Sequence, residues 1–256
     1  MPVHYVSVEE AMQRDGLRMV VVGGVPSLWG EAAKGILHVK RLDWVAVRLV
    51  YDNEALTSWA RQRSGPVLFH GDDEPRSRWD DILMLAERLA PAPALLPEEP
   101  GERALVLGLS HEICGEGGLG WSRRLQMVQA SLQGQGGFPE RVARYLGHKY
   151  GYGTEADRSC AARVGGKLRM LAARLRSQRA AGNAYLVGST LSAADIYCAT
   201  AMGMFDPLPP GQCDMDAALR EAFALRDEAT TAALDPVLLD HRERIYTEYL
   251  ELPLSL

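Results

Sequence analysis

The first ninety residues alternate short apolar runs with helical patterns. Residues 17–22 form a run rich in β-branched residues, which predicts a buried strand. A helical pattern opened by Pro26-Ser27 follows, and further strands are predicted over residues 44–51 and 67–69. Because a strand–helix–strand start implies a right-handed crossover, we expect the first two strands to be parallel.

Two polar residues in this region have the pattern of helix caps. Asn53 precedes a short helical stretch through Trp59 and Arg61 and is predicted to cap it. Ser77 and Asp80 have the spacing of a capping box and predict the start of another helix. The residues that this helix should turn towards the core are Ile82, Leu83, Leu85, Ala86 and Leu89.

Beyond residue 90 the pattern changes. Residues 91–102 contain four prolines, which predicts an extended linker. No strand-like alternation follows, and helical patterns are seen at 103–114, 121–132, 139–150, 155–181, 192–204, 214–226 and 236–250. We therefore predict an α/β domain over residues 1–90, a linker over 91–102 and an all-α domain over 103–256.

The most strongly specified helix start lies in the second half. Ser192 and Asp195 form a capping-box pattern, and Leu191 with Ile196 supplies the matching hydrophobic staple. The residues that follow, through Met204, are apolar nearly all round, so this helix is predicted to be buried.

Composition narrows the function classes. The chain is 47% hydrophobic and 24% charged, as in ordinary globular proteins, and its net charge of −5 argues against a nucleic-acid partner. No apolar run is long enough for a membrane span, and the first residues lack the pattern of an export signal, so we expect no membrane partner and a cytoplasmic location. The four cysteines all follow residue 113 and are expected to be reduced and buried.

The run from Tyr185-Leu-Val-Gly188 through Leu191-Ser192 to Ala194-Asp195-Ile196 resembles the N-capping signature in the C-terminal domain of glutathione transferases. The layout of the chain is similar as well. The resemblance implies a thioredoxin-like N-terminal domain followed by an all-helical C-terminal domain, usually in a homodimer. It also implies glutathione as cosubstrate, whose thiolate attacks an electrophilic apolar substrate.

The resemblance suggests a catalytic serine. When Lys40-Arg41-Leu42-Asp43-Trp44 is set on the corresponding stretch of the family, Ser27 takes the position of the serine that hydrogen-bonds the glutathione sulfur. Trp29 then lies in the adjoining turn and would line the substrate cleft. The alternative is that Ser27 is an ordinary helix cap.

The other glutathione-binding residues are also implied by the resemblance. Pro66 has the position of a cis-proline whose following residue, here Val67, pairs through its backbone with glutathione. The family's Glu-Ser or Asp-Ser pair at the next helix start is replaced here. Ser77 could hold the γ-glutamyl carboxylate, with Arg76 as a second donor and Asp80 facing the ammonium, or Ser77 and Asp80 could only cap the helix. Because of this altered stretch, the alternative function is a non-catalytic binding or scaffolding protein.

Four further features of the sequence have simpler interpretations. Residues 115–120 match GxGxxG, but they follow a helical pattern and are interpreted as a flexible break. The pair His111 and Cys114 has no second pair of ligands, so no metal site is expected. The basic stretch 158–179 is interpreted as the solvated face of a long helix. Trp121, with Tyr145, Tyr150 and Tyr152, would either line an apolar substrate cleft or belong to the core.

Overall fold

A four-stranded sheet forms one end of the protein. The computed structural model describes residues 3–153 and 159–256. In the sheet the strand order is β1-β3-β2-β4, where β1 is His4–Tyr5, β2 is Leu17–Val21, β3 is Trp44–Arg48 and β4 is Val67–His70. The strands β2 and β3 are parallel, as predicted, whereas β4 is antiparallel to β2. Strand β1 was not predicted; it pairs in parallel with β3 at the edge.

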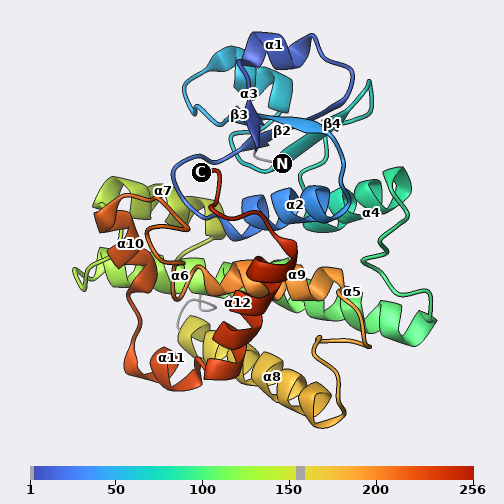
Figure 1. Ribbon diagram of the computed structural model, residues 1–256. Helices are drawn as coiled ribbons and strands as arrows, with labels where there is room; N and C mark the ends of the chain where they lie inside the picture. The colour runs from blue at the N-terminus through green and yellow to red at the C-terminus, as the bar shows by residue number, and fades with distance from the viewer. Residues whose placement is uncertain (1–2, 154–158) are drawn as a thin grey trace.

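Helices cover both faces of this sheet. The helices α1 (Val8–Met12) and α3 (Glu54–Ala60) pack on one face, and α2 (Leu28–Val39) and α4 (Trp79–Leu89) pack on the other (Figure 1). Side chains alternate along β2 between the two cores: Met19 and Val21 face α2, and Val20 faces α3. The predicted cap of α3 is confirmed, since the Asn53 side chain accepts a hydrogen bond from the Leu56 N–H.

The remaining helices form an all-α layer on the far side of α2 and α4 (Figure 1). They are α5 (Pro100–Cys114), α6 (Leu119–Leu132), α7 (Glu140–Tyr150), α8 (Cys160–Ala180), α9 (Ala193–Met202), α10 (Ala217–Ala224), α11 (Glu228–Ala233) and α12 (Pro236–Tyr249). Helix α11 was not predicted, and residues 155–158 of the predicted long helix lie outside the described residues. Among the described helices, none has the length and apolarity needed to cross a membrane.

Helix α5 begins at Pro100 rather than at residue 103. The Glu99 side chain caps it by accepting hydrogen bonds from the N–H groups of Gly101 and Glu102. Proline is well tolerated at a first helical position, because its missing N–H would have no partner there. Between α5 and α6, residues 115–118 form the predicted break.

The predicted buried helix α9 lies at the centre of the helical layer. All ten of its residues are buried, and it packs against α2, α5 and α12. The predicted capping box of Ser192 and Asp195 is confirmed. The buried Asp195 carboxylate accepts hydrogen bonds from the Leu186 N–H (2.8 Å), the Ser192 N–H (2.9 Å) and the Ser192 hydroxyl (2.7 Å). Nε2 of the buried His241, from α12, lies 3.2 Å from the same carboxylate.

The capping box predicted for Ser77 and Asp80 is wrong. Helix α4 begins at Trp79 with Arg78 at the N-cap, and no side chain caps it. The Asp80 carboxylate is instead held by the Arg78 guanidinium, at 2.8 and 3.1 Å. The main chain of Arg76 exchanges two hydrogen bonds with Leu68 of β4, which keeps the chain extended and delays the helix.

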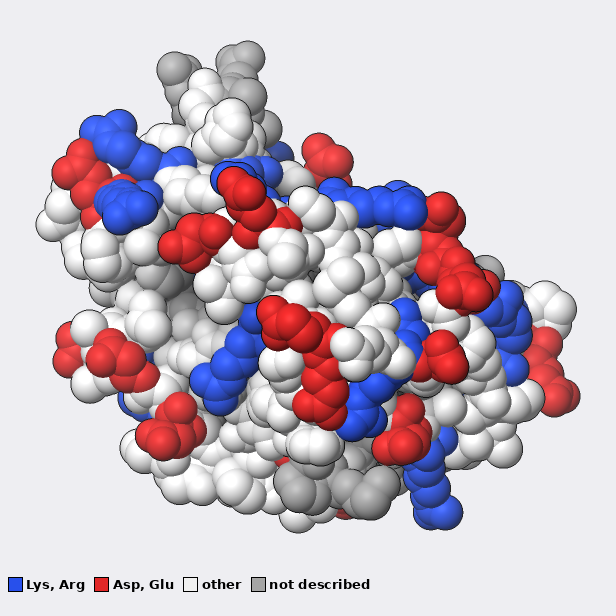
Figure 2. Space-filling view, turned by 90° about the horizontal axis from the view of Figure 1, so that it is seen from above, with Lys and Arg blue, Asp and Glu red and all other residues white. Residues whose placement is uncertain are grey.

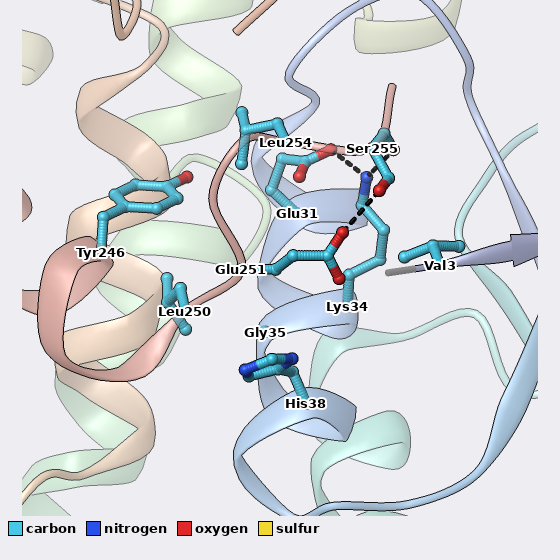
Figure 3. Close-up of a pocket in the computed structure, with 10 residues that line it drawn as sticks. All are labelled: Val3, Glu31, Lys34, Gly35, His38, Tyr246, Leu250, Glu251, Leu254 and Ser255. Atoms are coloured by element: carbon cyan, nitrogen blue, oxygen red, sulfur yellow. Dashed lines mark hydrogen bonds and ion pairs between the residues drawn. The ribbon is translucent and has the colours of Figure 1, made fainter. Parts of the chain in front are cut away.

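Residues 250–256, here called the C-terminal tail, return to the sheet. The Ser255 carbonyl accepts a hydrogen bond from the ammonium of Lys34 in α2 at 2.8 Å (Figure 3). It also accepts one from the Tyr5 hydroxyl at 3.0 Å. Arg48 donates to the main-chain oxygen of Leu256 at 2.8 Å. The tail therefore covers the buried Lys34, which also pairs with Glu31 at 2.7 Å. Burial raises the pKa of Glu31, and Lys34 offsets part of that shift.

Candidate functional site

The hydroxyl of Ser27 is not used to cap α2. Ser27 occupies the N-cap position with extended backbone, and its carbonyl accepts the Glu31 N–H at 2.7 Å. Its side chain makes no capping hydrogen bond, although Ser27 is buried. A serine at an N-cap usually bonds the second or third N–H of its helix. The hydroxyl of Ser27 is thus available for another partner.

The Gly65–Pro66 peptide bond is cis, which confirms that prediction. Val67 follows as the first residue of β4, buried and paired with Val20 of β2. Pro66 and Val67 therefore lie at the end of the sheet where β2 ends, and the Val67 side chain belongs to the core under α1 and α3.

A small cavity brings three of the predicted site residues together: Trp29, Pro66 and Ser77. The cavity measures about 10 Å³, which is room for about one water molecule. The residues that complete its lining are Ala33, Ile36, Trp79, Ile82 and Tyr197. Ser27, Val67, Arg76, Asp80 and Trp121 are not among its lining residues.

Trp79 fills the space between α4 and α9 beside this cavity. The Tyr197 hydroxyl donates to the Trp79 carbonyl at 3.0 Å, and the two rings meet edge to face with centroids 5.6 Å apart. His111 of α5 lies on another side, 6.4 Å from the Trp79 ring. Trp79 was not singled out from the sequence, because a tryptophan in a helical pattern carries no local sign of what it packs against.

The guanidinium beside Asp80 belongs to Arg78 and not to Arg76. The Arg76 side chain donates a hydrogen bond to Asp73 at 3.3 Å. Its main chain pairs with that of Leu68. The side chain of Arg78 is 70% exposed, and that of Asp80 is 30% exposed. Partial burial alone would raise the pKa of Asp80, but the hydrogen bonds and charge of Arg78 outweigh it and hold that pKa below its usual value.

The two predicted cleft tryptophans meet through Tyr150. The ring of Trp29 stacks on that of Tyr150, with ring centroids 6.0 Å apart. Trp121 meets Tyr150 edge to face, with ring centroids 4.8 Å apart. Both indole N–H groups are satisfied by main-chain carbonyls: Trp29 donates to Cys114 at 2.9 Å and Trp121 to Tyr150 at 3.1 Å. This cluster joins the start of α2 to α6 and α7.

Helix α7 also touches the loop that precedes Pro66. The Tyr145 hydroxyl donates to the Arg63 carbonyl at 3.2 Å, and the Lys149 ammonium donates to the Ser64 hydroxyl at 2.6 Å. Tyr51, just after β3, meets Tyr145 edge to face at 5.7 Å. These contacts bridge the α/β part and the helical layer close to the site.

The comparisons with known proteins give similarity in structure alone. No family model matches the sequence, and neither does any curated protein. A glutathione S-transferase of Methylobacterium radiotolerans, in complex with glutathione sulfonate, matches at 17% identity over 91% of both chains, with a TM-score of 0.61. One from Methylobacillus flagellatus, with glutathione bound, matches at 15% identity over 91% of this chain and 96% of that one, with a TM-score of 0.62.

A maleylacetoacetate isomerase of Methylobacterium extorquens, with malonate and glutathione bound, matches at 20% identity over 90% and 92% of the two chains, with a TM-score of 0.56. The chain has the glutathione transferase fold. The predicted fold class, a thioredoxin-like domain followed by an all-helical domain, is confirmed. In this glutathione transferase fold, β2-α2-β3-α3-β4-α4 is the thioredoxin-like unit, and β1 with α1 precedes it.

The cysteines of this glutathione transferase fold are all buried, as predicted. Burial raises the pKa values of Cys114, Cys198 and Cys213 above the ordinary value for a thiol. Since the thiolate is the reactive form, these thiols should be inert at neutral pH.

We therefore expect dithiobis(nitrobenzoate) to label fewer than about one thiol per native chain near pH 7.5, and all four in denaturant. The release of thionitrobenzoate, followed by absorbance, measures this directly. A thiol that reacts within seconds in the native protein would contradict the expectation. Cysteine-dependent thioltransferase activity should likewise be absent.

Proposed function

We propose that this protein is a glutathione-dependent transferase of the serine type. In the proposed reaction the glutathione thiol loses its proton, and Ser27 donates a hydrogen bond to the resulting thiolate. The thiol proton passes to solvent water. The sulfur then attacks an electrophilic carbon of an apolar substrate: as the carbon–sulfur bond forms, the bond from that carbon to its leaving group breaks, and the group departs with the bonding electrons. The observation that carries the proposal is the Ser27 hydroxyl, which stands at the start of α2 without serving as its cap.

The surroundings of Ser27 support glutathione as the cosubstrate. Each of the three similar structures described above holds glutathione or its sulfonate. Here the cis-Pro66 and the start of α4 meet at one cavity close to Trp29. We propose that the Val67 main chain pairs with the peptide part of glutathione.

The polar pair at the start of α4 fits the γ-glutamyl end of glutathione. That end carries a carboxylate and an ammonium on one carbon. Arg78 presents a guanidinium and Asp80 a carboxylate, side by side and partly exposed. We propose that Arg78, with the Ser77 hydroxyl, takes the ligand carboxylate, and that Asp80 takes the ammonium. Arg76 is left out, since Asp73 binds it.

The size of the cavity restricts how glutathione can lie. A space of about 10 Å³ cannot hold a tripeptide. We therefore propose that glutathione lies outside this cavity, along the surface that runs from Ser27 past the Val67 main chain to Arg78. The finer assignments made from the resemblance also remain proposals: a cytoplasmic homodimer, domain limits at residues 1–90 and 103–256, and a linker over 91–102.

Titration calorimetry with glutathione tests this proposal. Asp80→Asn should weaken glutathione binding by roughly tenfold, because a hydrogen bond between charged groups contributes ~1.5–3 kcal/mol. The matched control is Asp81→Asn, at the next and more exposed carboxylate, which lies 3.6 Å from Arg78. Equal losses of glutathione affinity in the two variants would show that Asp80 does not bind the ligand ammonium.

The second candidate function is a non-catalytic binding or scaffolding protein. It is favoured by the tight packing of Trp79 beside the cavity and by the contacts of α7 with the loop before Pro66. The two functions differ in a single measurement: the absence of binding heat with millimolar glutathione would support the scaffold and end the transferase proposal.

A further inference from the structure

A buried arginine near the proposed site lacks a carboxylate partner. Arg124 of α6 is only 7% exposed. Among the described residues, the groups that act on its charge are the phenols of Tyr150 and Tyr51 and the cations Arg123 and Lys149. The Tyr150 phenol favours the charged form of Arg124, but a neutral phenol does not balance its charge. Buried charges in proteins are normally paired, since an unpaired one costs several kcal/mol.

The aromatic rings around Arg124 stabilise its positive charge only in part. Its guanidinium lies 5.0 Å from the centroid of Phe223 and 5.9 Å from that of Phe138. A cation over an aromatic face is stabilised less than one that is paired with a carboxylate in the same place.

A second cation lies close by at the surface. Lys149 of α7 is exposed, and its ammonium donates to Ser64 and lies 5.5 Å from the centroid of Tyr150. Loss of solvent around the ammonium, and the like charge of Arg124, lower the pKa of Lys149. Arg124 and Lys149 repel each other, and a bound anion would reduce that repulsion.

The surface beside these cations is apolar and aromatic. Val142, Tyr145 and Lys149 follow one another on one face of α7. Tyr51, just after β3, meets Tyr145 of this face edge to face, and Val50 precedes Tyr51 in the chain. Val50, Tyr51, Val142 and Tyr145 are 46%, 46%, 39% and 42% exposed, so an incoming ring can reach them.

This aromatic and cationic cluster adjoins the proposed thiol site. Tyr150 stacks on Trp29, two residues after Ser27. Ser64, the partner of Lys149, stands two residues before Pro66. A ligand that lies against the exposed edges of Tyr51 and Tyr145 would therefore be close to the loop before Pro66 and to the start of α2.

We propose that the cluster of Tyr51, Tyr145, Tyr150, Arg124 and Lys149 binds a planar aromatic compound that carries one negative charge, such as a carboxylate or sulfonate. The ring lies against the tyrosines, and the charge is directed to Lys149 and Arg124. The electrophile of the proposed transferase belongs to this class; that part of the inference rests on the proposed function, whereas the binding itself does not.

A pair of probes of equal shape tests the charge requirement. Without glutathione, tryptophan fluorescence and calorimetry should show that 4-chlorobenzoate binds at least tenfold more tightly than neutral 4-chlorobenzamide. In Lys149→Met, which keeps the length and apolar character of the side chain, the ratio should fall to about threefold or less. Lys167→Met is the matched control: Lys167 pairs with Glu112, away from the cluster, and its loss should leave the ratio unchanged.

Several results would overturn the inference: equal affinities for the two probes, no binding of either, or an unchanged preference in Lys149→Met. Because the titration contains no glutathione, its outcome is independent of the test of the transferase proposal. If 4-chlorobenzoate is preferred but glutathione does not bind, the anion site is supported and the transferase proposal is contradicted. If glutathione binds but benzoate is not preferred, only the anion site falls.

Discussion

Replacement of Asp195 by alanine is expected to lower the free energy of unfolding by roughly 3–5 kcal/mol. The carboxylate is completely buried and accepts three hydrogen bonds, two of them from main-chain N–H groups of Leu186 and Ser192. Alanine would leave those N–H groups without their acceptor and would remove the carboxylate that lies 3.2 Å from the buried His241. Each buried donor without a partner costs ~1–3 kcal/mol. Denaturation by urea, followed by circular dichroism, measures the loss.

The matched control is Asp216→Ala at the start of α10. Asp216 also caps a helix, through the Leu219 N–H at 3.1 Å, but it is exposed. Its removal should cost only ~1 kcal/mol, as for an ordinary N-cap. If the two variants lose the same stability, Asp195 acts as a simple cap and its burial and extra partners contribute nothing.

The second large effect is expected in Ser27→Ala. If Ser27 stabilises the thiolate by ~1.5–3 kcal/mol, its loss should raise the thiol pKa of bound glutathione by roughly one to two units. Conjugation at neutral pH should then fall tenfold or more. At a pH above the new thiol pKa, most of that loss should be recovered, since the thiolate forms without help. Glutathione affinity should change less, because its other contacts remain.

Thiolate absorbance near 240 nm, recorded against pH in the glutathione complex, measures the shift in pKa. Ser58→Ala, at an exposed serine of α3, is the control and should leave the profile unchanged. Full conjugation activity in Ser27→Ala, or a glutathione-bound structure with the sulfur far from Ser27, would contradict the proposal. Ser27 would then have only a structural role at the start of α2.

Local patterns in the sequence predicted most of the fold. The β-branched runs gave β2, β3 and β4, and the Asn53 and Ser192–Asp195 caps were correct, because each depends on residues within one turn. The start of α4 was wrong because a distant partner, Leu68, pairs with the main chain of Arg76. Strand β1 is only two residues long, too short for any alternation to show.

The candidate site was harder to predict. The isomer of Pro66 followed from a family resemblance and not from the chemistry of its neighbours. Trp79 and Arg78 acquire their places through contacts with Tyr197 and Asp80, of which only the second is local. No pattern along the chain could show that Arg124 lacks a carboxylate, since that depends on every element packed around it.

The bond between Tyr5 and Ser255 joins residues 250 positions apart, and it has a consequence for biosynthesis. A ribosome makes the sheet and α2 first, while Tyr5 and the buried Lys34 still lack the carbonyl that they share. That carbonyl belongs to Ser255, which is made more than 200 residues after Lys34. The sheet and α2 can therefore form early, but their contact with residues 250–256 can form only after Ser255 has left the ribosome.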